Sequence, residues 1–292
     1  MRIIYPLAVL LAASVAGTAA DRPVPAAVRT MGGYQVLAAD FHVHVFPFGW
    51  SQLSVRETLL EATQQGLDAV AITPHVQTWQ ADMALWLAPR MGRSPIVIKG
   101  EEVTTPKFHV LAIGVDGTIS DQLSLSDTID AIHRRGGIAI AAHPYRVVWQ
   151  HYDAASLKKL DGSEVVRPEA QGRASLAEEL REFHAKAPLV AFGNSDFHGI
   201  GRIGASRTYV FANERSARGV MDAIRAGRTV VYDGDRAYGD PALIALAERS
   251  GGLPRATLEW PITGWMSVLS RVGSVGSLAA LVLFNRWNNV AR

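Results

Sequence analysis

The chain has 292 residues, of which 48% are hydrophobic and 19% charged, so it can bury a sizeable core and is unlike a disordered protein. Its 29 basic and 27 acidic residues give a net charge of +2, which argues against a dedicated nucleic-acid binder. Cysteine is absent, which excludes disulfides, thiolate metal ligands and a cysteine nucleophile. Any transition-metal site must therefore use histidine and carboxylate ligands.

Residues 1–20 have the layout of a secretory signal peptide. Arg2 makes the start basic, an apolar run covers residues 7–15, and the small residues 18–20 are typical of a cleavage site. A buried N-terminal helix is the alternative. We predict cleavage near Ala20 and export from the cytoplasm, which in a bacterium with two membranes means the periplasm.

Short apolar runs alternate with helical stretches in the body of the chain, which predicts a parallel α/β domain, either a barrel or a wound sheet. The expected strands cover residues 36–40, 69–73, 95–99, 108–113, 137–142, 188–193 and 207–211. The expected helices cover residues 54–65, 122–135, 175–186, 215–226 and 241–250. No internal repeat is visible, so one domain over residues 30–250 is the simplest partition.

The C-terminal segment 262–284 is long enough to span a bilayer, which takes ~20 residues. Arg271 lies toward its N-terminal end, from where it could reach the interface. Arg286 and Arg292 follow the segment, which favours a cytoplasmic tail and a globular body outside. We predict a membrane anchor; a helix packed on the domain or lying in the membrane interface is the alternative.

Histidines gather where the first expected strand ends. The run Asp40-Phe41-His42-Val43-His44 places Asp40, His42 and His44 on one face if the strand alternates regularly. Two imidazoles and a carboxylate on one face would form part of a metal-binding site. The alternative is a surface strand whose histidines have no function.

Three later strands also deliver polar residues just past their C-terminal ends. These residues are His75, His143, and the pair Asp196 and His198. Active sites of parallel α/β folds are built at that rim. Glu101 and Glu102 follow another apolar run and could supply a bridging carboxylate, while His109, which opens a strand, is a weaker ligand on its own. The chain has no G-x-S-x-G elbow and no P-loop.

The ordered motifs D-x-H-x-H, T-x-H, G-x-E, H, H-P and D-x-H resemble those of the polymerase and histidinol phosphatase (PHP) family, including its exported phosphoesterase-like and carbamate-hydrolase-like members. The match covers roughly residues 36–232. The residues that carry it are Asp40, His42, His44, His75, Glu102, His109, His143, Asp196 and His198.

The resemblance implies a distorted (β/α)7 barrel with two or three divalent ions, which would be Zn, Mn or Fe. The implied ligands are His42, His44, Glu102 and Asp196 for the first ion, Glu102, His109 and His143 for the second, and His75 and His198 for a third. The family pattern Gly-x-Glu selects Glu102 over Glu101. We assign Asp40 the role of orienting the imidazoles.

Two departures from the family pattern concern the third ion. Relatives often read Thr-Asp-His where this chain has Thr73-Pro74-His75. Relatives also often place a further His or Asp several residues after H-x-H, but the stretch 46–51 contains no such ligand. The third ion is therefore either missing or completed by water and substrate.

The resemblance implies a metal-dependent hydrolase acting on a small-molecule substrate, and phosphoester cleavage by a metal-bridging hydroxide is the favoured reaction. Asp196 and His198 are the expected catalytic residues, and Arg207 and Arg146 are candidates to bind phosphate oxygens. The same metal centre could instead cleave carboxyl or carbamate esters. A non-catalytic, membrane-tethered metal-binding protein is the alternative from a different class.

Overall fold

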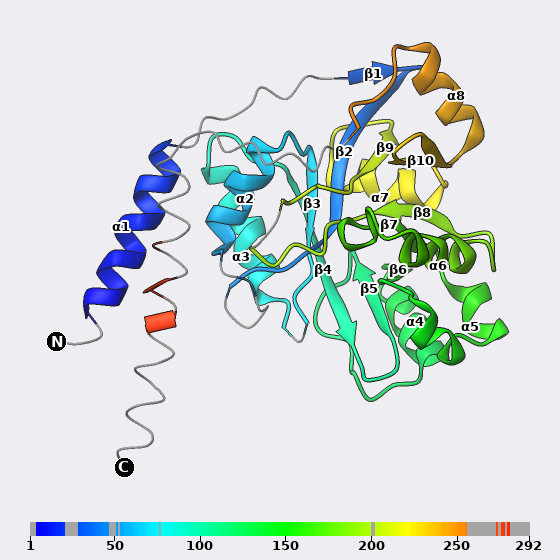
Figure 1. The fold of residues 1–292 in the computed structure, drawn as a ribbon, viewed down its shortest axis with the longest axis horizontal. Coiled ribbons are helices and arrows are strands. Elements are labelled where there is room, and N and C mark those ends of the chain that lie inside the picture. The colour runs from blue at the N-terminus through cyan, green and yellow to red at the C-terminus, as the bar shows by residue number, and fades with distance from the viewer. Residues whose placement is uncertain are drawn as a thin grey trace.

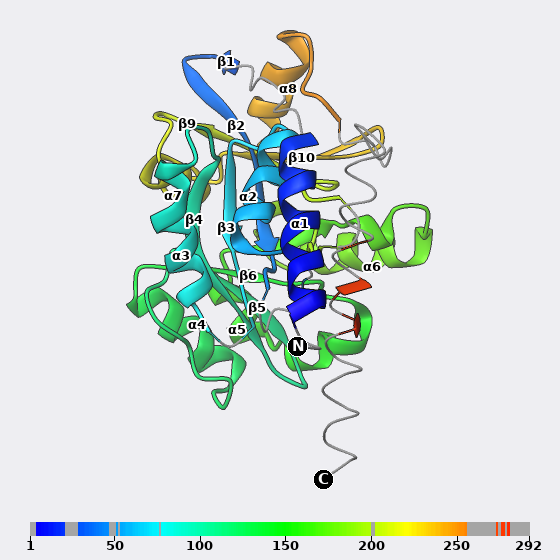
Figure 2. The ribbon, with the colours of Figure 1, turned by 90° about the vertical axis from the view of Figure 1, so that its left-hand side faces the viewer.

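The computed structural model describes residues 4–20, 29–46, 51, 53–75, 77–199, 202–255, 273, 276–277 and 279–280. Helix α1 (Ile4–Ala20) covers the predicted signal peptide and lies to one side of the body, beside α2 (Figures 1 and 2). The expected anchor at 262–284 lies almost entirely outside the described residues. Within the described part of the chain, no helix is both long and apolar enough to cross a membrane.

Seven consecutive strands of a larger sheet form a nearly closed barrel at the centre of the molecule (Figure 1). They are β2 (Tyr34–Val43), β3 (Ala69–Ile72), β4 (Ile96–Thr104), β5 (His109–Ile113), β6 (Ile138–Ala141), β7 (Gly162–Val166) and β8 (Val190–Gly193). The gap between first and last is bridged where the His44 amide donates to the Phe197 carbonyl at 2.9 Å. This α/β barrel fits the predicted architecture.

The sequence pattern led us to expect an all-parallel barrel, but one strand of the barrel runs in the opposite direction. Strands β2, β3 and β4 run parallel, and so do β6, β7 and β8, but β5 is antiparallel to both of its neighbours. The turn between β4 and β5 contains only residues 105–108. Such a short connection can join antiparallel strands, whereas a parallel pair needs a crossover of a dozen residues or more.

Four further strands extend the sheet beyond β2. They are β1 (Arg29–Met31), β9 (Thr208–Ala212), β10 (Thr229–Asp233) and β11 (Arg236–Gly239). All pair antiparallel, with β9 running beside β2 and β10 beside β9. The last part of the body, which the alternating pattern suggested would continue the barrel, therefore forms an antiparallel extension.

Helices cover the outside of the sheet (Figures 1 and 2). They are α2 (Val55–Gln64), α3 (Trp79–Leu87), α4 (Leu125–Arg134), α5 (Ala154–Lys159), α6 (Ala174–His184), α7 (Ala217–Arg225) and α8 (Pro241–Arg249). Ser54 begins α2 with a complete capping box, in which its hydroxyl accepts from the Glu57 amide and the Glu57 carboxylate accepts from its own amide. Ser124, Asp153, Ser216 and Asp240 cap α4, α5, α7 and α8 in a similar way.

Candidate metal centre

A β-bulge in β2 directs two histidines into the barrel. Val36 and Ala38 share one core cluster with Val43 and Val45, although strict alternation would put positions 36 and 43 on opposite faces. The register of β2 against β3 shifts between Asp40 and Val43, which accounts for the change of face. His42 and His44, both fully buried, consequently project away from that cluster.

The prediction that Asp40 shares a face with His42 and His44, and orients their rings, is therefore wrong. The Asp40 carboxylate accepts from the backbone amides of His42, Ser195 and Gly204 at 3.2, 3.1 and 2.9 Å, and from the Ser195 hydroxyl. Burial raises its pKa to about 6 even though these hydrogen bonds act in the opposite direction. Asp40 fixes the loop after β8 and touches no imidazole that the structure describes.

The remaining expected ligands arrive from the ends of other strands. His75 follows β3, Glu102 lies within β4, His143 follows β6, and Asp196 and His198 follow β8. His109 is the first residue of β5, and because β5 runs in reverse, its first residue lies at the same rim as the last residues of the other strands. Reversal of one strand explains why a histidine at the start of a strand joins residues that follow strands.

The eight residues form three overlapping groups in which one atom from each residue lies within 4.8 Å of the others. The groups are His42, His44, Glu102 and Asp196; Glu102, His109 and His143; and His44, His75 and His198. The structure thus gathers every ligand that the resemblance implies, and adds His44 to the third group.

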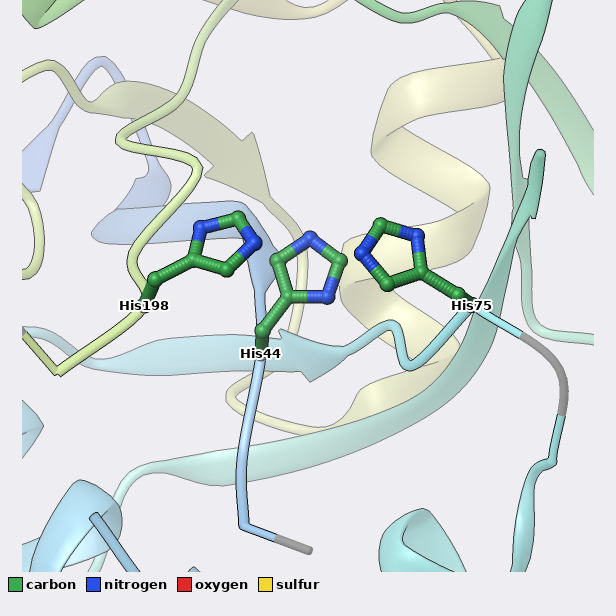
Figure 3. A group of neighbouring side chains, drawn as sticks. All are labelled: His44, His75 and His198. Carbon is green, nitrogen blue, oxygen red and sulfur yellow. The ribbon is translucent and has the colours of Figure 1, made fainter. Parts of the chain in front are cut away.

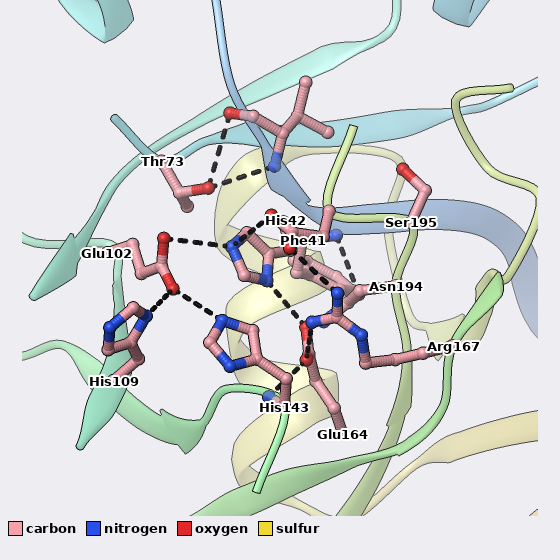
Figure 4. Close-up of polar contacts among 12 residues, drawn as sticks. Phe41, His42, Thr73, Glu102, His109, His143, Glu164, Arg167, Asn194 and Ser195 are labelled. Atoms are coloured by element: carbon pink, nitrogen blue, oxygen red, sulfur yellow. Dashed lines mark hydrogen bonds and ion pairs between the residues drawn. The ribbon is translucent and has the colours of Figure 1, made fainter. Parts of the chain in front are cut away.

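Glu102 is the residue common to the first two groups (Figure 4). Its Oε1 lies 2.8 Å from His109 Nδ1 and 2.9 Å from His143 Nε2. Its Oε2 lies 3.3 Å from His42 Nε2 and 3.4 Å from His44 Nε2. One carboxylate therefore presents one oxygen to each group, as a bridge between two cations requires.

Several donor atoms at the centre of the first group are buried without a hydrogen-bond partner among the described residues. They are His42 Nε2, both ring nitrogens of His44, Glu102 Oε2 and Asp196 Oδ1. His42 Nε2 and His44 Nε2 each lie 3.0 Å from Asp196 Oδ1, so the atoms converge. Buried polar atoms without partners are costly, and a divalent cation bound by imidazole nitrogen and carboxylate oxygen would satisfy them together. The donor set fits a metal ion.

The third group is a stack of three imidazoles. The His44 ring lies between those of His75 and His198, with centroids at 4.3 and 4.1 Å (Figure 3). His198 Nδ1 lies 2.8 Å from the Asp196 carbonyl oxygen, which can only accept, so Nδ1 carries the proton and Nε2 keeps a lone pair. Among described residues this group contains no carboxylate, and it is more exposed than the first.

Electrostatics favour ionised carboxylates in the cluster. Burial alone would raise the pKa of Glu102 and of Asp196, but the neighbouring His42 overcomes it and holds both pKa values well below the usual range. Burial would likewise lower the pKa of His42, whereas Asp196, Glu102 and Glu164 raise it well above the ordinary value. His42 is therefore the ring at which a proton competes with a cation.

Two buried residues beneath the cluster were missed by the sequence reasoning. Glu164, fully buried in β7, contacts His42 and the backbone of His143 (Figure 4). Arg167, just after β7, contacts Asp196. Strand β7 was not expected, because the run Gly162–Val166 is short and contains Ser163 and Glu164 in place of apolar residues. The sequence did contain one indication of this pair, because Glu164 and Arg167 have opposite charges and flank the apolar residues Val165 and Val166.

The two arginines expected to bind substrate lie in different places. Arg146 follows His143 and lines an open cleft of about 640 Å³ together with His143, Arg167 and Asp196. Arg207 donates to the backbone carbonyls of Gly204 and Gln65, at 2.9 and 3.3 Å, and is absent from the described lining of that cleft. Both arginines thus have protein partners, since Arg146 Nη2 also donates to Glu182 at 2.6 Å, but only Arg146 lies in the described wall of the cleft and stays a candidate for substrate contact.

Comparisons with known proteins find several to which the chain is similar. The PHP-associated family model, PHP_C, matches residues 178–229. An uncharacterized protein of Methanocaldococcus jannaschii is 29% identical over 140 residues, which cover 44% of this chain and 81% of that protein. The fold is similar to a crystal structure from Bacteroides vulgatus ATCC 8482, described as a two-domain protein containing a predicted PHP-like metal-dependent phosphoesterase.

That structure aligns with a TM-score of 0.56 and 24% sequence identity over 77% of this chain and 72% of its own. At this identity the likeness speaks for the barrel fold. The family model begins within α6 and continues through β8, β9 and α7, and so includes Asp196 and His198. The matched segment and the shared barrel agree with the resemblance of the ordered ligand motifs to the PHP family.

Proposed function

We propose that this protein is a metal-dependent hydrolase that cleaves phosphoesters. The observation that carries the proposal is the sharing of Glu102 between two groups of inward-facing ligands. Divalent ions held by such adjacent groups supply Lewis acidity for a phosphoryl oxygen and lower the pKa of water. The description of the B. vulgatus neighbour as a predicted phosphoesterase supports the choice of substrate class.

Some residues of the site would bind the ions, and others would contact the substrate. His42, His44 and Asp196 would hold the first ion together with Glu102, which also reaches His109 and His143. The cleft of about 640 Å³ beside them has His143 and Asp196 in its wall, so a substrate in the cleft would lie against both groups. Arg146 and the apolar side chains of Val147 and Leu176 complete part of its lining.

His198 is the better candidate for proton transfer, and Asp196 acts as a ligand. Arg167 Nη2 lies 2.8 Å from Asp196 Oδ2, and Oδ1 faces the imidazoles where an ion would bind, so neither oxygen is left for proton transfer to a substrate. Burial and the nearby His44 lower the pKa of His198, so its ring is neutral near pH 7. Its free Nε2 can then either accept a proton or join His75 as a ligand.

The test is hydrolysis by the full-length protein, loaded separately with Mn²⁺ and Zn²⁺. A panel of phosphomonoesters, phosphodiesters, aryl carboxyl esters and carbamates separates the possible reactions. We expect metal-dependent phosphate release that Glu102→Gln abolishes and Glu101→Gln retains. Cleavage confined to the carbon esters would replace the phosphoesterase assignment, and metal binding without any hydrolysis would favour a metal-binding protein.

We also propose that the protein works outside the cytoplasm, attached to the membrane by residues 262–284. The charge and composition of residues 1–20 support export, and the apolar run near the C-terminus supports attachment. Mass spectrometry of the protein recovered from its host tests the first point, since cleavage near Ala20 removes α1. Membrane fractionation with and without residues 256–292 tests the second.

A further inference from the structure

We propose that Glu164 and Arg167 form a buried clamp that positions the metal ligands, and that the clamp sets metal affinity without itself binding ion or substrate. Nothing in the sequence motifs assigns either residue a role. The inference rests on the proposed metal centre, and its readout is metal binding, which is independent of hydrolysis.

Glu164 is the hub of the clamp. Its Oε1 lies 2.8 Å from His42 Nδ1 and accepts from Asn194 Nδ2 at 3.1 Å. Its Oε2 accepts from the His143 backbone amide at 2.6 Å and from Arg167 Nη1 at 2.9 Å. Both carboxylate oxygens are thus used, on partners that follow or belong to different strands.

The contact with His42 selects the tautomer that can bind metal. An ionised carboxylate accepts and cannot donate, so His42 Nδ1 must carry the proton. Glu164 acts as an acceptor throughout, because Arg167 Nη1 and the His143 amide donate to its Oε2 and Asn194 Nδ2 donates to its Oε1. His42 Nε2 is then left with its lone pair toward Asp196 Oδ1 and Glu102 Oε2, where a cation would lie.

Arg167 holds the other end of the clamp. Its side chain is 3% exposed, and Nη1 donates to Glu164, Nη2 to both Asp196 and Glu169, and Nε to Glu169. The contact with Asp196 Oδ2 turns Oδ1 toward the imidazoles. With three carboxylates around it, Arg167 has little capacity left for a substrate phosphate, although it lines the cleft.

Backbone geometry shows what the clamp holds in place. His143 and Asp196 have φ values of 31° and 51°, and among the described residues they are the two non-glycine residues with positive φ. This conformation is unfavourable for residues with a side chain, and surrounding structure must maintain it. Glu164 binds the amide of the first and Arg167 binds the carboxylate of the second, so the clamp contacts both strained ligands.

The experiment compares Arg167→Met and Arg167→Lys with a matched control, Arg215→Met. Arg215 Nη1 pairs at 2.7 Å with Asp68, whose side chain is 2% exposed, so the control also strips an arginine from a buried carboxylate. Metal-free full-length proteins are titrated with Mn²⁺ and Zn²⁺ against a chelator of known affinity. The d–d absorption of the Co²⁺-loaded proteins reports ligand geometry, and urea unfolding reports stability.

We expect Arg167→Met to weaken metal binding by ~10–100-fold, the usual effect of removing a group that orients a ligand. Arg167→Lys should recover part of the loss, because an ammonium can approach one carboxylate but lacks the planar fork that spans Glu164 and Asp196. The Co²⁺ spectrum should change in both variants. Arg215→Met should lose stability while its metal affinity and spectrum match those of the wild type.

Two outcomes would overturn the inference. One is wild-type metal affinity and an unchanged Co²⁺ spectrum in Arg167→Lys, the variant that keeps the buried charge and folds most readily. The other is an equal loss of affinity in Arg215→Met, which would mean that the effect follows stability alone. Neither outcome depends on hydrolysis, so failure of the clamp and failure of the phosphoesterase proposal remain distinguishable.

Discussion

Replacing Glu102 by Gln should disable two ion sites with one isosteric change. The side chain of Glu102 is 1% exposed and presents one oxygen to His109 and His143 and the other to His42 and His44. The amide keeps the shape, removes the negative charge and leaves only one oxygen. One ion would therefore lose this ligand, and the other would keep a neutral amide oxygen in place of a carboxylate oxygen.

The expected magnitude follows from the number of contacts. Removing a group that only orients a ligand costs ~10–100-fold in metal affinity, so removing the charge of the ligand itself should cost at least ~100-fold at each site. A 100-fold loss corresponds to ~2.7 kcal/mol of binding free energy. His109→Ala, by comparison, should affect only the second group, because His109 belongs to no other.

The assay measures bound ions per protein after desalting, together with chelator-competition titrations. Glu101→Gln is the matched control, since Glu101 is the adjacent residue and is equally buried, but its carboxylate accepts from the Ile119 amide at 2.7 Å. Burial raises the pKa of Glu101 to about 7, so the neutral amide resembles its protonated form. Retention of the wild-type ion count and affinity in Glu102→Gln would refute the bridging role.

Three further predictions concern stability and pH. Phe183→Ala should destabilise the fold by ~3–5 kcal/mol in urea unfolding, because Phe183 is fully buried with its ring centroid 4.9 Å from that of Tyr152; a loss below ~1 kcal/mol would contradict this. Burial lowers the pKa of His184, whose Nδ1 lies 2.8 Å from Ser163 Oγ. The stability that its neutral ring contributes should be complete above the unfolded pKa of ~6.5 and be lost as the pH falls through the lower folded pKa, and a His184→Gln variant should show a shallower pH dependence between about pH 7.5 and 5. Metal affinity should fall on acidification, because the raised pKa of His42 means that protons compete for its ring; equal Mn²⁺ affinity at pH 8 and pH 6 would exclude that competition.

The sequence predicted well those parts of the fold that short-range pattern controls. Helices expected at 54–65 and 215–226 correspond to α2 and α7, whose ends are marked by serine caps and by Gly66 and Gly227. Strands such as β3 and β6 are short apolar runs buried on both faces, and that composition is readable without any partner. Each also ends just before a histidine, which is why the ligand set could be proposed.

Features that depend on long-range pairing could not be read in the same way. The antiparallel course of β5 comes from a tight turn followed by pairing with both β4 and β6, and neither leaves a periodic signal. The bulge in β2 moves Asp40 to the face opposite His42, which regular alternation cannot anticipate. Strand β7 was missed because Glu164 interrupts its apolar character, and its charge makes sense only beside Arg167 and His42.

The ligands span residues 42 to 198 and come from strands all around the barrel, so no local fragment of the chain contains a complete site. A cation can therefore bind the folded domain and has no equivalent site on the unfolded chain. Mass action then adds folding stability of ~2.7 kcal/mol when the free ion reaches 100 times its dissociation constant. A resident ion would in this way couple the lifetime of the protein to the supply of that ion, and its scarcity would expose the chain to proteolysis as well as inactivate the site.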